Sequence, residues 1–249
     1  VGSEMCIRDS MYAGKPVVIK PKSTNFGLGI TILKHNYDET DFKGALQIAF
    51  EHDNTLLIEK FIPGREFRIF IINDEVVGIL HRVPANVTGD GVLNIGQLID
   101  RKNEDPLRGK GYRTPLEKIR KGREEEMFLK QQGMDFNTVP KEGEVVYLRE
   151  NSNISTGGDS IDFTDDIDDS YKAIAVEAAK ALNVKITGLD MMIQDIHAPA
   201  TPDNYAIIEM NFNPAIHIHC YPFKGKNRHL NHKICLLYTS PSPRDGATS

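Results

Sequence analysis

The strongest chemical pattern in the sequence is a pair of oxygen-bearing side chains, Glu209 and Asn211, at the end of an apolar run. The run has strand character, so two residues two positions apart point to the same face. A carboxylate and an amide beside a hydrophobic run are costly to bury unless something pairs with them. Asp190 adds a third oxygen ligand at the end of another apolar run. Such oxygens suit a hard cation, which predicts a Mg²⁺ or Mn²⁺ site of the kind used in phosphoryl transfer.

A glycine-containing loop at 21–29 is a second candidate site, and Lys20 directly precedes it. The loop has neither the Gly-Lys-Ser/Thr ending of a P-loop nor the third glycine of a dinucleotide fingerprint. Lysines before the glycines suit a flap whose backbone N–H groups close over phosphates while Lys20 supplies a point charge. An ordinary glycine-rich hairpin is the alternative. The candidate phosphate contacts are Lys20, Lys22, Ser23, Gly27 and Gly29.

Three further patterns allow more than one interpretation. Glu59 and Glu66 lie seven apart across a Pro-Gly turn, which by itself indicates a hinge with solvated acids. The basic loop 101–113 is either a solvated surface loop or an anion-handling loop. The sequence His217-x-His219-Cys220 offers imidazole and thiolate ligands for zinc, with His81 as one possible addition. Packing or substrate contact is favoured there, because the cluster supplies three ligands at most.

Hydrophobic periodicity predicts the elements that must position these residues. Strands are expected at 16–20, 30–33, 55–59, 144–149, 186–193 and 205–211, and a hairpin joins 66–72 to 76–82 through Asn73-Asp74. Helices are expected over 40–52, after an Asn94 cap, and from Asp169 or Ser170 to Leu182. The capping-box pattern Thr114-Pro115-Leu116-Glu117 predicts one more helix start. The opening third, strand–strand–helix–strand, suits an α+β lobe.

Composition sets limits on the class of protein. The chain has 249 residues, enough for one large domain or two lobes, with 40% hydrophobic and 26% charged residues. A net charge of −5 argues against a nucleic-acid binder, and no apolar run approaches the ~20 residues of a membrane span. Three cysteines indicate a reducing compartment, which we expect to be the cytoplasm. The ends, 1–10 and 235–249, resemble translated sequencing-adapter read-through, and we expect the second to be a disordered tail.

The order of the blocks resembles the ATP-grasp carboxylate–amine ligases. Lys20 with its flap, the 59–66 block, Asp190 and Glu209-x-Asn211 follow one another as in that family. Four longer stretches are similar to the glutathione synthetase half of bacterial bifunctional glutamate–cysteine ligase/glutathione synthetases; they lie at 82–87, 105–115, 147–159 and 211–220. Cyanophycin synthetase shares some of them. The resemblance covers roughly 15–234, and several ordered blocks are more specific than one motif.

The resemblance implies an α+β ATP-grasp fold with nucleotide between two lobes, a small one at 11–62 and a large one at 63–234. It implies that Lys20 and the flap hold ATP phosphates, that Glu59, Lys60, Phe61 and Ile62 form the adenine hinge, and that Glu66 accepts ribose hydroxyls. Asp190, Glu209 and Asn211 would hold the metal that neutralises charge as the γ-phosphoryl group leaves. Arg149 would stabilise the acyl-phosphate charge, while Asn151, Asn153 and the amides of 156–158 would hold phosphate or a substrate carboxylate.

The implied reaction is ATP-dependent amide formation through an acyl phosphate, with γ-glutamylcysteine and glycine as the expected substrates. Such an intermediate must be kept from water, so positioning matters more than general-base chemistry. The family's pattern also implies an N-terminal ligase domain in a longer parent, with further phosphate and substrate residues ahead of the flap. Two alternatives remain open: a cyanophycin-type or other amino-acid ligase, and a truncated, non-catalytic ATP-binding fragment.

Overall fold

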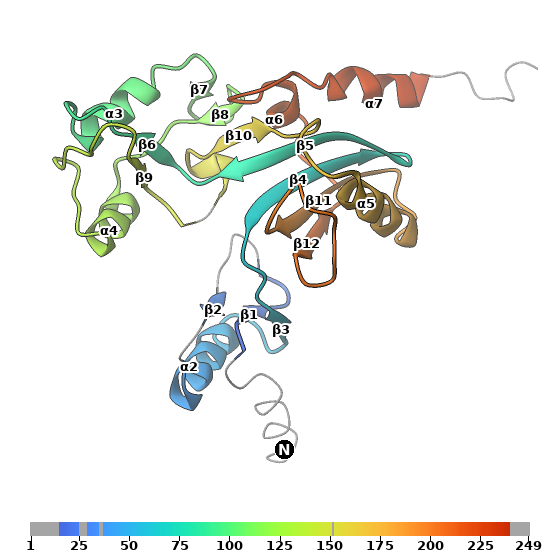
Figure 1. Ribbon diagram of the computed structural model, residues 1–249, viewed down its shortest axis with the longest axis horizontal. Coiled ribbons are helices and arrows are strands. Elements are labelled where there is room, and N and C mark those ends of the chain that lie inside the picture. The colour runs from blue at the N-terminus through green and yellow to red at the C-terminus, as the bar shows by residue number, and fades with distance from the viewer. Residues whose placement is uncertain (1–14, 25–28, 35–36, 151, 240–249) are drawn as a thin grey trace, which may run out of the picture. The chain divides into compact units, whose positions relative to one another are not determined.

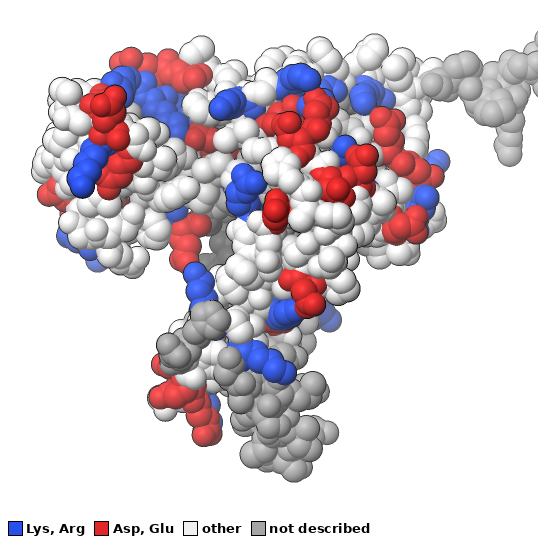
Figure 2. Space-filling model, viewed as in Figure 1, with Lys and Arg blue, Asp and Glu red and all other residues white. Residues whose placement is uncertain are grey.

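The computed structural model describes residues 15–24, 29–34, 37–150 and 152–239, and Figure 1 shows their elements. The chain divides into two compact units, Val1–Pro63 and Gly64–Ser249. On the face drawn in Figure 2, acidic and basic residues are interspersed, which fits the modest net charge of −5. In the described residues no helix is long and apolar enough to cross a membrane.

The first unit is a three-stranded antiparallel sheet covered on one face by a helix. Strand β1 (Val17–Pro21) lies between β2 (Thr31–Leu33) and β3 (Leu56–Lys60), and the helix is α2 (Glu39–Phe50). The inward residues of β1, Val17 and Ile19, pack with apolar residues of α2. Because side chains alternate along a strand, Lys20 lies on the opposite face, where Glu59 also lies. The helix therefore leaves the charged face of this sheet uncovered within its own unit.

The second unit is built on a five-stranded antiparallel sheet of order β10-β5-β4-β11-β12. Its strands are β4 (Arg65–Ile72), β5 (Glu75–Val83), β10 (Asp159–Asp162), β11 (Ile186–Ile193) and β12 (Tyr205–Asn211). Helix α5 (Asp169–Ala181) covers one face, over a core that includes Phe67, Ile69 and Leu189 (Figure 1). Helices α6 (His217–Cys220) and α7 (Leu230–Thr239) pack on the other face against Phe70 and Ile72.

A smaller hydrophobic cluster follows the central hairpin. Strands β6 (Asn86–Thr88) and β9 (Val145–Tyr147) pair and pack with α3 (Ile95–Lys102) and α4 (Arg123–Gln131). Short strands β7 (Arg108–Gly109) and β8 (Leu116–Glu117) pair in parallel, and the 3-10 turn η1 (Ile154–Thr156) leads into β10.

The structure confirms most of the expected elements, including the hairpin at Asn73-Asp74, where Asn73 has a φ of 51°. Asn94 caps α3 by accepting from the backbone N–H of Gln97 at 2.8 Å. Helix α5 begins at Asp169 behind an Asp168 cap.

Two expectations are wrong. No helix starts at the Thr114–Glu117 pattern, although that stretch is fully described; Leu116–Glu117 is strand β8. The Glu117 carboxylate instead accepts from the backbone N–H groups of Gly111 and Tyr112 at 3.2 and 2.5 Å. Glu117 thus accepts from residues five and six positions before it in place of capping a helix that would follow. The expected tail from Cys235 is also wrong in part, because 235–239 complete α7, where Leu237 packs against the α6–α7 core.

Candidate nucleotide and metal site

Two candidate nucleotide residues meet in the first unit. Lys20 Nζ lies 2.7 Å from Glu59 Oε2, with 16% and 46% of the two side chains exposed. Val18 is directly opposite Glu59 in the β1–β3 register. Lys20 is two residues after Val18, so its side chain lies on the same face of the sheet as Glu59. Lys20 is mostly buried, whereas its Glu59 partner faces water. The Lys20 ammonium therefore lies on the uncovered face of the sheet with one exposed acid as its partner.

The flap is described only at its two ends. The backbone N–H of Lys22 donates to Thr55 O at 2.9 Å, and that of Ser23 donates to the Asp53 carboxylate at 2.8 Å. Gly29 has a φ of +75°, and a Cβ there would come within 2.7 Å of both His52 and Pro21. A side chain at Gly29 would be strained by its backbone and by these neighbours. Gly27 lies outside the described residues.

The predicted adenine hinge closes the first unit. Lys60 is exposed at the end of β3, and the backbone N–H of Phe61 donates to Pro16 O at 2.9 Å. Lys34 Nζ lies 5.7 Å from the centre of the Phe61 ring, and Ile62 is buried. The Phe61 N–H is thus used within the unit. Of the two backbone groups of Phe61, the carbonyl is the candidate for an adenine contact.

The predicted metal residues come together on β11 and β12. Asp190 is the direct partner of Glu209 in the antiparallel register, so both side chains lie on one face. Asn211 follows on the same face, and its Nδ2 donates to Glu209 Oε1 at 2.9 Å. Glu209 is exposed, whereas Asp190 is 2% exposed. Among the described residues no cluster of three or more His, Cys, Asp or Glu side chains could hold a metal; this set contains two acids and an amide.

Sequence reasoning missed the two arginines that hold Asp190. Arg68 binds its carboxylate through Nε and Nη2, and Arg82 Nη2 donates to Oδ2 at 2.9 Å. A carboxylate offers about four lone-pair sites, so these three bonds leave Oδ1 with capacity for one more partner. The donor set thus fits a metal at Glu209 and Asn211 and at one remaining lone pair of Asp190. Strand alternation was the available signal, since Arg68 is two residues after Glu66.

Glu66 is already engaged by protein groups. The Ser152 hydroxyl donates to Glu66 Oε2 at 2.6 Å, and Arg82 forms an ion pair with Oε1. Asn151 lies outside the described residues. Asn153 caps η1, and its carbonyl accepts from the N–H groups of Thr156 and Gly158, both at 3.2 Å.

The amides of 156–158 are therefore not arranged for a ligand as expected. The Gly157 N–H also donates internally, to Ile154 O at 3.1 Å. The glycine has a separate structural reason: its φ is +95°, and a Cβ would approach Ile119 Cα to 2.8 Å. This turn uses its backbone donors to hold its own shape.

Arg149 lies two residues beyond the end of β9, which is shorter than the expected strand 144–149, and its guanidinium faces the acidic first turn of α4. Its Nη2 and Nε are both 2.6 Å from Glu125 Oε1, and Nη1 pairs with Glu124. Glu125 is 1% exposed, whereas 71% of the Glu124 side chain is exposed. The Glu125 pair is a buried anchor, and only the exposed Glu124 pair leaves a guanidinium nitrogen that an incoming anion can recruit.

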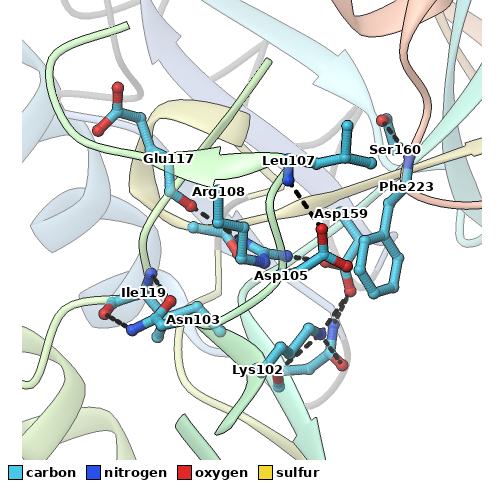
Figure 3. Close-up of polar contacts among 12 residues, drawn as sticks. Lys102, Asn103, Asp105, Leu107, Arg108, Glu117, Ile119, Asp159, Ser160 and Phe223 are labelled. Carbon is cyan, nitrogen blue, oxygen red and sulfur yellow. Dashed lines mark hydrogen bonds and ion pairs between the residues drawn. The ribbon is translucent and has the colours of Figure 1, made fainter. Parts of the chain in front are cut away.

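The basic loop 101–113 is partly buried: Lys110 and Arg113 are exposed, whereas Lys102 and Arg108 are engaged within the protein. Its Arg108 is buried, with Nη2 paired to Asp159 and Nη1 donating to Glu117 O and Gly157 O at 2.8 and 3.0 Å (Figure 3). Lys102 Nζ lies 2.6 Å from Asp159 Oδ2 and also donates to both oxygens of Asn86. Burial lowers the pKa of Lys102 and of Arg108, and Asp159 opposes that shift in both. This group joins α3, β7 and β10.

A cavity of about 290 Å³ lies beside that group and is lined in part by Lys102, Asp159 and Phe223. The ring centre of Phe223 is 5.2 Å from Lys102 Nζ and 5.4 Å from the Arg108 guanidinium carbon. All three donors of the lysine are taken by protein oxygens, and so the cavity presents no spare lysine donor to a ligand.

The structure separates the residues of the zinc alternative. His81 packs between Phe67 and Phe163 on the α5 face of the sheet, with ring centres 5.2 and 6.1 Å away. His219 packs against Phe70 on the opposite face, 5.3 Å between ring centres. Cys220 is buried, and its Sγ contacts Asn231 Oδ1 at 3.6 Å. His81 and His219 therefore do not share a site.

Because His219 is buried, we expect the folded state to lose stability in acid. It is fully buried, its two ring nitrogens lack hydrogen-bond partners among the described residues, and burial lowers its pKa to about 3. In the unfolded chain the ordinary pKa of ~6.5 applies, so below pH 6.5 the unfolded state binds the proton first. The stabilisation is complete above pH 6.5 and is lost as pH falls toward 3. Between pH 7 and pH 5 we expect the protonation of His219 to lower the free energy of unfolding by about 2 kcal/mol.

Urea unfolding at pH 7, 6 and 5 measures this effect. His219→Gln should flatten the pH dependence, while His197→Gln, at an exposed position after β11, should leave the wild-type slope. An unchanged slope in His219→Gln would show that another group governs the acid transition.

Comparisons with known proteins agree with this fold. The family model described as D-ala D-ala ligase C-terminus matches residues 3–94. The glutathione biosynthesis bifunctional proteins GshAB of Desulfotalea psychrophila and Clostridium perfringens are 63% and 58% identical to the chain over 223 and 224 residues. Each match covers 90% of this chain, which spans 29% of the length of either relative.

The crystal structure of a bifunctional glutathione synthetase from Pasteurella multocida superposes with a TM-score of 0.76 at 45% identity, over 94% of this chain and 32% of that one. The chain thus has the ATP-grasp fold, of mixed α+β type. It is homologous to one segment of the bifunctional glutathione biosynthesis proteins.

Proposed function

We propose that this chain carries the ATP-binding and metal-binding part of a carboxylate–amine ligase that makes glutathione from γ-glutamylcysteine and glycine. The observation that carries the proposal is the alignment of Asp190, Glu209 and Asn211 on one face of two paired strands, in a chain with the ATP-grasp fold. The substrates are inferred from the names of relatives more than 55% identical over 90% of the chain.

In this proposal the residues act mainly by position and charge. Lys20 exchanges Glu59 for phosphate, and the hinge 59–62 holds the base. Glu66 exchanges the Ser152 hydroxyl for ribose hydroxyls, which are similar donors. Asn153 orders the turn before β10 through its carbonyl, and Arg149 turns its Glu124-facing nitrogen to developing negative charge.

The metal residues fit a hard divalent cation, Mg²⁺ or Mn²⁺. Glu209 and Asn211 present exposed or half-buried oxygens, and Asp190 offers the lone pair that its arginines leave. When bound, the cation would neutralise charge on the transferring phosphoryl group. The protein's own contribution is to hold the carboxylates on one face and to keep the acyl phosphate from water.

The proposal predicts that MgATP binds the chain and raises its melting temperature. Ligand at 100 times its dissociation constant adds about 2.7 kcal/mol of stability, so a shift of several degrees is expected in a thermal melt. ADP and phosphate should then be released when γ-glutamylcysteine and glycine are both present. The control is MgGTP, because the hinge is expected to read adenine.

Each other result has a definite meaning. Binding of MgATP without turnover would make the chain a non-catalytic nucleotide module. Turnover with arginine or aspartate in place of glycine would indicate a cyanophycin-type or other amino-acid ligase. A melting temperature unchanged by saturating MgATP would contradict the nucleotide site itself.

The proposed location is the cytoplasm, whose reducing conditions would keep the free thiols of Cys220 and Cys235 reduced.

A further inference from the structure

One guanidinium in the second unit contacts two carboxylates to which the proposed function gives different tasks. Arg82 Nη2 forms ion pairs with Glu66 Oε1 on β4 and with Asp190 Oδ2 on β11, the latter at 2.9 Å. The side chains are 13%, 23% and 2% exposed, so the contacts lie mostly out of water. Arg82 itself stands on β5, three strands away from the metal residues of β12.

The neighbouring arginine makes a simpler contact and provides a comparison. Arg68 is the direct partner of Asp190 in the β4–β11 register and binds its carboxylate with two nitrogens. Among the described residues, the Glu66 carboxylate is held by Arg82 and by the Ser152 hydroxyl. Arg68 therefore fixes Asp190, whereas Arg82 fixes Asp190 relative to Glu66.

Arg82 also has a donor that the described residues leave unused. Its Nε is buried and has no hydrogen-bond acceptor among the described residues. Buried donors in native proteins are nearly always satisfied, and each exception calls for an explanation. An acceptor that arrives with the ligand, such as a phosphate oxygen or an ordered water, would provide one.

We propose that Arg82 is a positioning residue that sets the spacing between the ribose-binding and metal-binding ends of the nucleotide site. The inference rests on the proposed function, in which Glu66 accepts the ribose hydroxyls and Asp190 holds the metal. A planar guanidinium can donate to two carboxylates in fixed directions, which the point charge of lysine cannot reproduce. Loss of Arg82 should therefore weaken both ends of the site together.

Two ratios of dissociation constants test this directly on the 249-residue chain by calorimetry; in each, the Kd of the first-named ligand is divided by that of the second. The first compares 2′,3′-dideoxy-ATP with ATP, both with Mg²⁺, and reports the ribose end. The second compares ATP in EDTA with ATP in Mg²⁺ and reports the metal end. Changes to partners of a metal ligand typically cost 10–100-fold in metal affinity, so Arg82→Lys should reduce the second ratio by at least tenfold. It should also reduce the first ratio severalfold.

Matched variants separate positioning from folding. Arg68→Lys should lower only the metal ratio, and Glu66→Gln only the ribose ratio. Arg228→Lys is the structural control, because Arg228 also bridges two carboxylates, Asp162 and Asp165, and is 16% exposed. It should leave both ratios unchanged, even if the melting temperature falls. A decrease in both ratios in Arg82→Lys, with Arg68→Lys and Glu66→Gln each lowering one ratio alone, would support the proposal.

Wild-type ratios in Arg82→Lys, or a change in one ratio alone, would overturn the inference while leaving the proposed function intact. Failure of the wild-type chain to bind ATP would overturn both. A loss shared equally by Arg228→Lys would assign the effect to the fold and would also contradict the positioning role.

Discussion

Glu209→Gln should remove most of the magnesium dependence of ATP binding. Glu209 is the exposed carboxylate of the proposed metal set, and glutamine keeps its size while replacing a charged ligand by a neutral one. Substitution of a residue that holds a metal ligand typically lowers metal affinity 10–100-fold. Substitution of a ligand itself should lower it at least as much. The affinity for MgATP should therefore fall at least 10–100-fold, or about 1.4–2.8 kcal/mol, while that for ATP in EDTA should change little.

Calorimetry with and without Mg²⁺ measures both quantities on one sample. Glu177→Gln is the control, because Glu177 is an exposed carboxylate on α5 paired with Lys180 at 3.4 Å. The variant Asn211→Asp makes the opposite change in charge, since it adds a negative charge to the metal set beside Glu209. Magnesium dependence that persists at the wild-type level in Glu209→Gln would move the metal away from β12.

Asp159→Asn should cause the largest loss of stability among the charged residues of the second unit. Asparagine keeps the shape but leaves buried Arg108 and mostly buried Lys102 without their shared counter-charge. Removing one partner of a buried pair typically costs about 3–5 kcal/mol. Because Arg108 also donates to Gly157 O, the turn before β10 should lose order along with the pair.

Urea unfolding with a fitted m-value measures the cost, since an unchanged m-value shows that the denatured state has not changed. Adding Arg108→Met to Asp159→Asn removes one buried charge and should recover part of the loss. Asp100→Asn serves as the control, because the Asp100–Lys121 pair at 2.6 Å is exposed on both sides and should contribute below about 1 kcal/mol. A loss in Asp159→Asn no greater than in this control would show that the buried group contributes nothing net.

Local sequence patterns were sufficient for strands β1 to β5, β11 and β12, for helices α2, α3 and α5, and for the candidate metal face, but not for β10 or α4. Strand alternation places Glu209 and Asn211 together, and period 3.6 with an Asn94 cap predicts α3, because both depend on residues near one another in the chain. The error at Thr114–Glu117 arose between two local patterns that compete for the same residue. A capping box stabilises a helix weakly, and the acceptor role of Glu117 toward Gly111 and Tyr112 decided the outcome.

Only the tertiary structure decided which charges meet. The sequence determined that Asp190, Glu209 and Asn211 are oxygen ligands at strand ends, and that Lys20 precedes a glycine loop. It did not determine that Arg68 and Arg82, 122 and 108 residues from Asp190, would converge on its carboxylate. Nor did it show that Arg149 faces α4 or that Arg108 is buried on Asp159. Ion pairs depend on strand order and register, which are set by burial of the whole sheet, whereas the ligands of one strand depend on its own alternation.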